Sequence, residues 1–198
     1  MAETNGKSLA SPAHNDNIDD ELLVKQFSNG DDSAFDRIVE KYSAGIGVFA
    51  NRLLGWPGDV DDIVQDIFLA AFLGLKRFRC ECSLKTWLFT ITINECRNYR
   101  CRQVLRLKIF SKAAERKSSS PPDPADKKAM DRDTFDRIRR AIRALPAKYR
   151  EPLVLKYLQE LSTNEISRIL DISQNALQAR LSRARKRLKQ DLAELIEE

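Results

Sequence analysis

The chain has 198 residues, of which 42% are hydrophobic and 32% are charged, and its formal net charge is +5 with a pI of about 9.1. This length allows one domain of ordinary size or two small ones, with enough apolar residues for packed cores. Because no run approaches the roughly 20 apolar residues of a membrane span, and nothing after Met1 resembles a signal peptide, we expect a cytoplasmic chain without membrane insertion and with reduced thiols.

The N-terminal part of the chain predicts a polar tail followed by a helical bundle. Residues 1–17 are small and polar and are expected to be disordered. Helical spacing of apolar residues then predicts four helices, over 19–27, 33–54, 59–75 and from residue 84 onward. Asp59 is expected to cap the third helix and Ser83 the fourth. Together these elements predict a compact domain over 18–106.

The C-terminal part predicts a linker and a second helical domain. Periodicity is lost around Ser118–Pro124, a run that cannot continue a helix and buries little. We therefore expect a linker over 107–130 and a second domain over 131–198. No alternating strand pattern occurs in the sequence, so the predicted fold is all-α, with two small helical domains joined by a flexible linker.

The second domain carries the pattern of a helix-turn-helix. Ser162 and Glu165 form a capping box at the start of a short helix, a tight turn follows at Asp171, and Ser173 caps a longer basic helix. A helix of this kind fits the DNA major groove, where Gln and Asn pair with adenine and Arg pairs with guanine. The outer face of the last helix carries Gln174, Asn175, Gln178, Arg180 and Arg183. An ordinary helical hairpin with a charged exterior is the alternative.

The first domain carries a different pattern, in which cations alternate with aromatic residues along the fourth helix. Aromatic faces stack on exposed bases while cations follow phosphates, as in proteins that hold single strands. The preceding loop, 78–82, could receive an extruded base. Trp87 falls on the apolar stripe and can equally belong to the core, whereas Phe89 lies off the stripe and is the better candidate for stacking.

Charge is unevenly distributed along the chain. Six basic residues and one acidic residue lie between Lys85 and Lys108, and six basic and no acidic residues lie between Ile172 and Lys189. Two such stretches could hold an anionic polymer at two places, and two solvated helix faces are the alternative. Four cysteines, at 80, 82, 96 and 101, match no zinc-site spacing, so we expect no metal and no cofactor.

Two motifs give the chain a family resemblance. The run Asp59–Phe68, followed by Arg77–Arg79 and Ser83–Leu88, closely resembles region 2 of the extracytoplasmic-function (ECF) sigma factors of bacterial RNA polymerase. The runs Leu145–Leu155 and Glu165–Leu188, with Leu161 and Ser162, resemble region 4 of the same family. The resemblance implies a sigma factor that binds core RNA polymerase, directs it to promoters and helps to melt the DNA.

The resemblance also implies roles for particular residues. Docking on the polymerase is expected to involve Asp59, Asp62, Gln65 and Asp66. Reading the minus-ten element, including its melted non-template strand, is expected to involve Phe78, Arg79, Ser83, Lys85, Thr86, Trp87, Asn94, Arg97, Asn98 and Arg100. Reading the minus-thirty-five element in duplex DNA is expected to involve Ser162, Gln174, Asn175, Gln178, Ala179, Arg180, Ser182, Arg183, Arg185 and Lys186.

The further implied partner is a separate anti-sigma factor that wedges between the two domains. Catalysis would stay with the polymerase, so the chain is expected to have no enzymatic activity and no small-molecule substrate. Asp171, Asn175 and Ala176 depart from the residues common at their positions in region 4, which affects the expected base preference. The alternative function is a helix-turn-helix regulator that binds duplex DNA without being a polymerase subunit.

Overall fold

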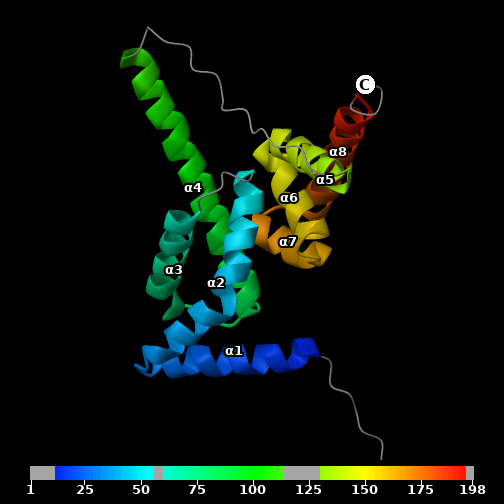
Figure 1. Ribbon diagram of the computed structural model, residues 1–198. Helices are drawn as coiled ribbons and strands as arrows, with labels where there is room; N and C mark the ends of the chain where they lie inside the picture. The colour runs from blue at the N-terminus through cyan, green and yellow to red at the C-terminus, as the bar shows by residue number, and fades with distance from the viewer. Residues whose placement is uncertain (1–11, 56–59, 114–129, 195–198) are drawn as a thin grey trace, which may run out of the picture.

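The computed structural model describes residues 12–55, 60–113 and 130–194, and within these segments all regular structure is α-helical (Figure 1). The helices are α1 Pro12–Ser28, α2 Ser33–Leu54, α3 Asp61–Leu75, α4 Leu84–Ala113, α5 Met130–Ala144, α6 Ala147–Tyr157, α7 Thr163–Leu170 and α8 Gln174–Glu194. The first four form an N-terminal half and the last four a C-terminal half. The prediction of an all-α fold with two helical groups is therefore confirmed.

In the N-terminal half, α2, α3 and α4 pack against one another, and α1 lies across one end of them (Figure 1). Apolar residues recur at helical spacing along α2, so one side of this helix is buried over its whole length. Aromatic pairs fill the core at both ends. The Phe27 and Phe35 ring centroids lie 5.8 Å apart, and the rings of Phe49 and Phe89, which join α2 to α4, lie 4.5 Å apart.

In the C-terminal half, α6, α7 and α8 enclose a second group of buried aliphatic side chains. Its most buried members include Val154, Leu155, Ile166, Leu177 and Ala184. Pro152 lies inside α6, where its missing N–H removes one helical hydrogen bond, and the helix ends five residues later. The buried residues of both halves form one continuous cluster, so the two cores touch.

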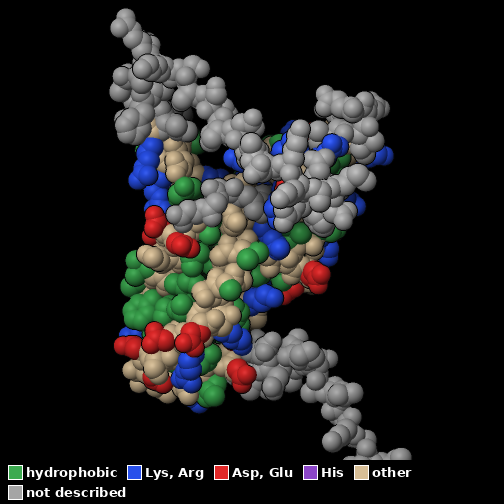
Figure 2. All heavy atoms as spheres, in the orientation of Figure 1, with side chains coloured by type: hydrophobic (Ala, Val, Ile, Leu, Met, Phe, Trp, Pro, Cys, Tyr) green, Lys and Arg blue, Asp and Glu red, His purple; other side chains and the backbone are tan. Residues whose placement is uncertain are grey.

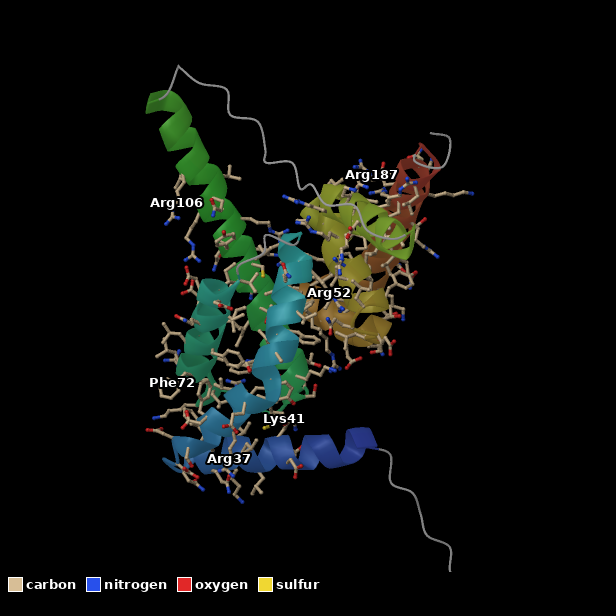
Figure 3. The ribbon with its side chains drawn as sticks, in the orientation of Figure 1. Arg37, Lys41, Arg52, Phe72, Arg106 and Arg187 are labelled. Carbon is tan, nitrogen blue, oxygen red and sulfur yellow. The ribbon has the colours of Figure 1, made fainter. Side chains whose placement is uncertain are left out.

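The two halves meet where α2 contacts α6 and α4 contacts α7. Arg52 of α2 donates a hydrogen bond of 3.2 Å from Nη1 to the carbonyl oxygen of Leu158, just beyond α6 (Figure 3). Gly55 ends α2 in the left-handed conformation, with φ +84°, and its N–H bonds to the carbonyl of Asn51. A Cβ at Gly55 would lie 2.9 Å from Cγ of Arg143 in α5, so the end of α2 abuts the C-terminal half closely.

Some helix ends differ from those expected from the sequence. Helix α1 begins at Pro12, inside the expected tail 1–17, and proline is well suited to a first helical position. Helix α4 continues to Ala113, through part of the expected linker 107–130, because good helix formers continue past residue 106. Val60 stands at the N-cap of α3 without a side-chain cap, and Asp59 lies outside the described residues.

Replacing Gly55 with alanine should destabilise the chain by about 1–3 kcal/mol. The new Cβ would be strained at positive φ and would press against the Arg143 side chain. Urea unfolding followed by circular dichroism measures the change. Gly30→Ala is the matched control, since Gly30 also has a positive φ, of +96°, but a Cβ added there would have no atom within 4 Å. An equal loss of unfolding free energy in the two variants would contradict the close contact at Gly55.

Candidate nucleic-acid interface

The helix-turn-helix forms as the sequence predicts. Ser162 Oγ accepts from the N–H of Glu165, and the Glu165 carboxylate accepts from the N–H of Ser162 at 2.9 Å, which completes the capping box. Asp171 closes α7 in the left-handed conformation with φ +53°, a conformation that Asp tolerates better than most residues. Ser173 Oγ then accepts from the N–H of Ala176 and starts α8. These local bonds fix the angle between α7 and α8.

The residues expected to read duplex DNA lie mostly on one exposed surface. Those with exposed side chains are Ser162, Gln174, Asn175, Gln178, Ala179, Ser182, Arg183, Arg185 and Lys186. Gln174 Nε2 donates to Oδ1 of Asn164 at 2.5 Å, so this surface includes a residue of α7 that sequence reasoning missed. Arg180 is the exception. It is half-buried because it lies beside the Leu177 and Leu181 stripe of α8, and it faces α4.

The start of α4 is held by residues expected to read the minus-ten element. Ser83 Oγ accepts from the N–H of Thr86 at 3.1 Å and bonds to its hydroxyl at 2.8 Å, so Ser83 caps the helix as expected. Thr86 is only 4% exposed. The expectation that Thr86 contacts DNA is therefore not supported, since its side chain is already engaged by the cap.

The aromatic residues near this helix start divide between surface and core. Phe78 and Trp87 are half-buried, and their rings pack together at a tilt of 38°, with centroids 5.1 Å apart. Phe89, which the sequence favours for stacking on bases, is 3% exposed and packs on Phe49. That interpretation was wrong because α2 covers the side of α4 on which Phe89 lies. Lys85 is exposed beside Phe89, with Nζ 5.7 Å from the ring centroid.

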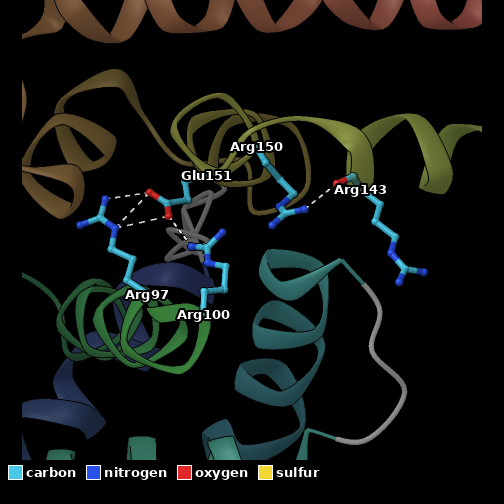
Figure 4. A network of polar contacts seen from close by, with 5 residues as sticks. All are labelled: Arg97, Arg100, Arg143, Arg150 and Glu151. Atoms are coloured by element: carbon cyan, nitrogen blue, oxygen red, sulfur yellow. Dashed lines mark hydrogen bonds and ion pairs between the residues drawn. The ribbon is translucent and has the colours of Figure 1, made fainter. Parts of the chain in front are cut away.

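The remaining minus-ten candidates fall into two groups. Arg79, Asn94 and Asn98 are exposed. Arg97 and Arg100 instead point from α4 toward α6, where both bind the carboxylate of Glu151 (Figure 4). The structure thus brings two expected DNA-binding residues against the other half of the molecule. Sequence reasoning missed Glu151, which carries no local signal of this role.

A hollow of about 660 Å³ opens beside this ionic contact. Its lining includes four cations, one carboxylate and one thiol: Arg97, Arg100, Lys148, Arg180, Glu151 and Cys101. Arg150 lies close by and is buried, with Nη1 donating to the carbonyl of Arg143 at 2.8 Å. Burial, and then the neighbouring Arg100, lowers the pKa of Arg150. The junction between the halves therefore holds more positive than negative charge.

The residues expected to dock on the polymerase lie on α3. Asp62, Gln65 and Asp66 are all exposed. Asp66 forms an exposed ion pair with Arg102 of α4, at 3.1 Å, which is a weak interaction because both groups are about half exposed. Asp62 lies in the first turn, where the helix dipole also favours an acid, whereas Asp66 lies beyond it.

Helix α3 also exposes apolar residues that sequence reasoning missed. Leu69, Phe72 and Leu73 are 60%, 37% and 69% exposed, and Figure 2 shows hydrophobic side chains gathered over α3. Leu69 and Leu73 are four residues apart and follow the acidic residues along the helix. Their positions outside the buried stripe could have indicated an exposed apolar patch.

The four cysteines have reduced thiols in different environments. Cys80 and Cys101 are exposed, Cys82 is intermediate and Cys96 is buried. Cys80 has a positive φ of +53° in the loop before α4. No group of His, Cys, Asp and Glu side chains suited to a metal ion occurs among the described residues. In the same residues, no helix has the length and apolar character needed to cross a membrane.

Comparison with known families identifies both halves of the chain. A family model described as "Sigma-70 region 2" matches residues 38–105, and one described as "Sigma-70, region 4" matches residues 135–188. The chain belongs to the sigma-70 family. Together the two regions cover more than half of the sequence, and they occur in the order and on the halves expected from the sequence.

Similar proteins refine this assignment to the ECF group. The ECF RNA polymerase sigma-E factor of Escherichia coli (strain K12) is 28% identical over 189 residues, which cover 90% of this chain and 97% of that protein. The factor of the same name from Haemophilus influenzae is 27% identical over 190 residues, which cover 90% of this chain and 98% of that protein. The prediction of an ECF sigma factor is confirmed, and its partners are core RNA polymerase and promoter DNA.

Solved structures of similar proteins share the fold. One is CnrH in complex with the cytosolic domain of CnrY, with 27% identity, a TM-score of 0.63, and coverage of 88% of this chain and 97% of that one. Another is the sigma factor RpoE in complex with the anti-sigma factor NepR from Bartonella quintana. It has 25% identity, a TM-score of 0.61, and coverage of 80% of this chain and 96% of that one.

The cysteines of the sigma factor should differ sharply in reactivity. Burial raises the pKa of Cys96 to about 12, so this thiol stays protonated well above neutral pH and is also shielded from reagents. At pH 8, a thiol reagent such as dithionitrobenzoate should modify the exposed Cys80 and Cys101 first. Cys96 should react only when urea unfolds the chain. Mass spectrometry of peptides checks the order, and early modification of Cys96 would contradict its burial.

Proposed function

We propose that this sigma factor docks on core RNA polymerase through α3, reads and melts the minus-ten element with the start of α4, and reads the minus-thirty-five element with α8. We further propose that the functional domains span 18–106 and 131–198, with the segment between them threading toward the RNA exit path of the polymerase. The main support is the pairing of an exposed acidic helix with two separate basic surfaces on one chain.

The docking surface proposed on α3 combines Asp62, Gln65 and Asp66 with the exposed Leu69 and Leu73 further along the helix. The acids would meet basic groups of the polymerase, while the leucines would gain contact area by leaving water. Asp59, which lies outside the described residues, is also proposed to contribute to docking.

The minus-ten surface proposed here combines exposed cations and amides with an aromatic stack. Phe78 and Trp87 offer apolar faces to unstacked bases, because their rings are only half-buried. The exposed polar groups nearby are Arg79, Lys85, Asn94 and Asn98. Arg97 and Arg100 are proposed to join them as phosphate-binding residues once they leave Glu151.

The minus-thirty-five surface is proposed to lie on the exposed side of α8. Gln174, Asn175 and Gln178 are near the start of the helix, where side chains reach base edges in the major groove. Arg183 would also reach base edges, and Arg185 and Lys186 lie further along and would bind phosphates, which sets affinity and its salt dependence. Ser162, Ala179 and Ser182 would make close contacts beside them, and Arg180 would join this set when α8 moves away from α4.

We also propose that the chain acts in the cytoplasm without enzymatic activity of its own, since the nucleotidyl transfer belongs to the polymerase. A separate anti-sigma factor is the proposed inhibitor. RpoE from Bartonella quintana, which resembles this chain in fold, has been solved in complex with the anti-sigma factor NepR.

Reversing two charges on α3 tests the docking surface. The double variant Asp62→Lys, Asp66→Lys should reduce run-off transcription with core RNA polymerase about tenfold or more, because like charges brought together at an interface cost several kcal/mol. Genomic promoter fragments that yield transcripts only with the unmodified sigma factor serve as templates. Circular dichroism should show the same helix content in both proteins.

Glu40→Lys provides the control, because Glu40 is an exposed acid on α2 rather than on α3. It should transcribe like the unmodified protein. Full transcription by the α3 variant would overturn the docking surface. If no fragment is transcribed and the polymerase does not bind the unmodified chain, the alternative of a duplex-binding regulator takes its place.

A further inference from the structure

The contact between the halves includes one buried carboxylate. Glu151, in the first turns of α6, is 3% exposed at its side chain, and each of its oxygens binds a different guanidinium of α4. Arg97 Nη2 lies 2.7 Å from Oε2, and Arg100 Nη2 lies 2.7 Å from Oε1, with Arg97 Nε 3.3 Å from both oxygens (Figure 4). Short charge-assisted bonds of this kind are strong, so they fix α6 against α4.

The same two arginines cannot bind Glu151 and DNA fully at once. A guanidinium binds a carboxylate and a phosphate with the same planar set of N–H donors. Arg97 and Arg100 keep only 40% and 23% of their side-chain surface exposed while Glu151 is in place. A strand approaching α4 would therefore have to displace the carboxylate first.

The arrangement also brings the two DNA-reading helices too close together. Elements named minus ten and minus thirty-five are about 25 base pairs apart, which is roughly 85 Å at ~3.4 Å per base pair. Here α7 contacts α4, and Arg180 of α8 lines the same hollow as Arg97. The halves must separate before one molecule can occupy both elements.

The junction also contains strain that favours opening. Arg100 Nη1 and Arg150 Nε are buried without a hydrogen-bond partner among the described residues. Buried donors of this kind reduce the stability of the structure that holds them. Opening would expose both guanidiniums to water or to phosphate, so these unpaired donors oppose the ionic contact that Glu151 makes in the closed form.

We propose that Glu151 is an internal competitor of promoter DNA, which keeps the unbound sigma factor closed by occupying Arg97 and Arg100. This inference rests on the proposed minus-ten role of these two arginines. Release of Glu151 does two things at once, since it frees a phosphate-binding pair on α4 and lets α8 move away to the more distant element.

The variant Glu151→Gln tests the proposal in the full-length chain. The amide keeps the shape but loses the charge, so the closed fraction should fall. Two quantities are measured at one fixed salt concentration: the radius of gyration by small-angle X-ray scattering, and the affinity for a fluorescent 15-nucleotide oligo-dT strand by anisotropy. We expect a larger radius and affinity raised about tenfold, since apparent affinity scales with the fraction of competent molecules.

Glu160→Gln is the matched control for charge, because Glu160 is an exposed acid of the same half. It should change neither quantity appreciably. A second variant guards against misfolding at Glu151. Arg52→Ala removes another bond between the halves, to Leu158, and should also enlarge the chain and raise affinity. Because it removes a cation, a rise in affinity for DNA cannot come from net charge.

The remaining outcomes separate the two parts of the proposal. If Glu151→Gln and Arg52→Ala leave both the radius and the affinity at the control values, the closing role of Glu151 is overturned. In that case the double variant Arg97→Ala, Arg100→Ala would still lower the affinity for DNA. If the radius grows but affinity does not, the arginines do not bind DNA, which overturns the competition and their minus-ten role together. When Arg97 and Arg100 are replaced by alanine in the Glu151→Gln variant, loss of its gain in affinity supports the whole proposal.

Discussion

One buried carboxylate links the two halves of this sigma factor. Taking Glu151 and two guanidiniums out of water carries a large desolvation cost, which their short bonds must offset. A buried pair of this kind adds little net stability, yet removing one partner typically costs about 3–5 kcal/mol because the other charge stays buried and unpaired. The interaction therefore affects the arrangement of the two halves more than it affects the free energy of unfolding of each half.

The distribution of charge on α4 follows from this constraint. Arg97 and Arg100 bind an acid of the same chain in the closed arrangement and are the arginines proposed to bind DNA phosphates when it opens, and the exposed Asn94 and Asn98 lie on the same helix. Helix α8 also takes part in the junction: most of its polar side chains face water, while Arg180 lines the hollow beside α4. The acidic and apolar residues of helix α3 that are proposed to dock on the polymerase are exposed in the closed arrangement.

Much of the fold could be predicted because its signals are local. The caps at Ser83 and Ser162, the left-handed end of α2 at Gly55 and the helix-turn-helix each depend on residues within a few positions of one another. Phe89 could not be assigned from spacing alone, because its burial depends on Phe49 of another helix. The pairing of Arg97 and Arg100 with Glu151 joins residues more than fifty positions apart, and no sequence pattern marks it.

The account rests on the halves being closed in the unbound chain and apart on the polymerase. Energy transfer between fluorophores on noncanonical residues at the exposed positions 105 in α4 and 148 in α6, which line the same hollow, tests this directly, without using the four native cysteines. Transfer should be high in the unbound protein and should fall when core RNA polymerase is added. High transfer that persists in a complex active in transcription would contradict the account.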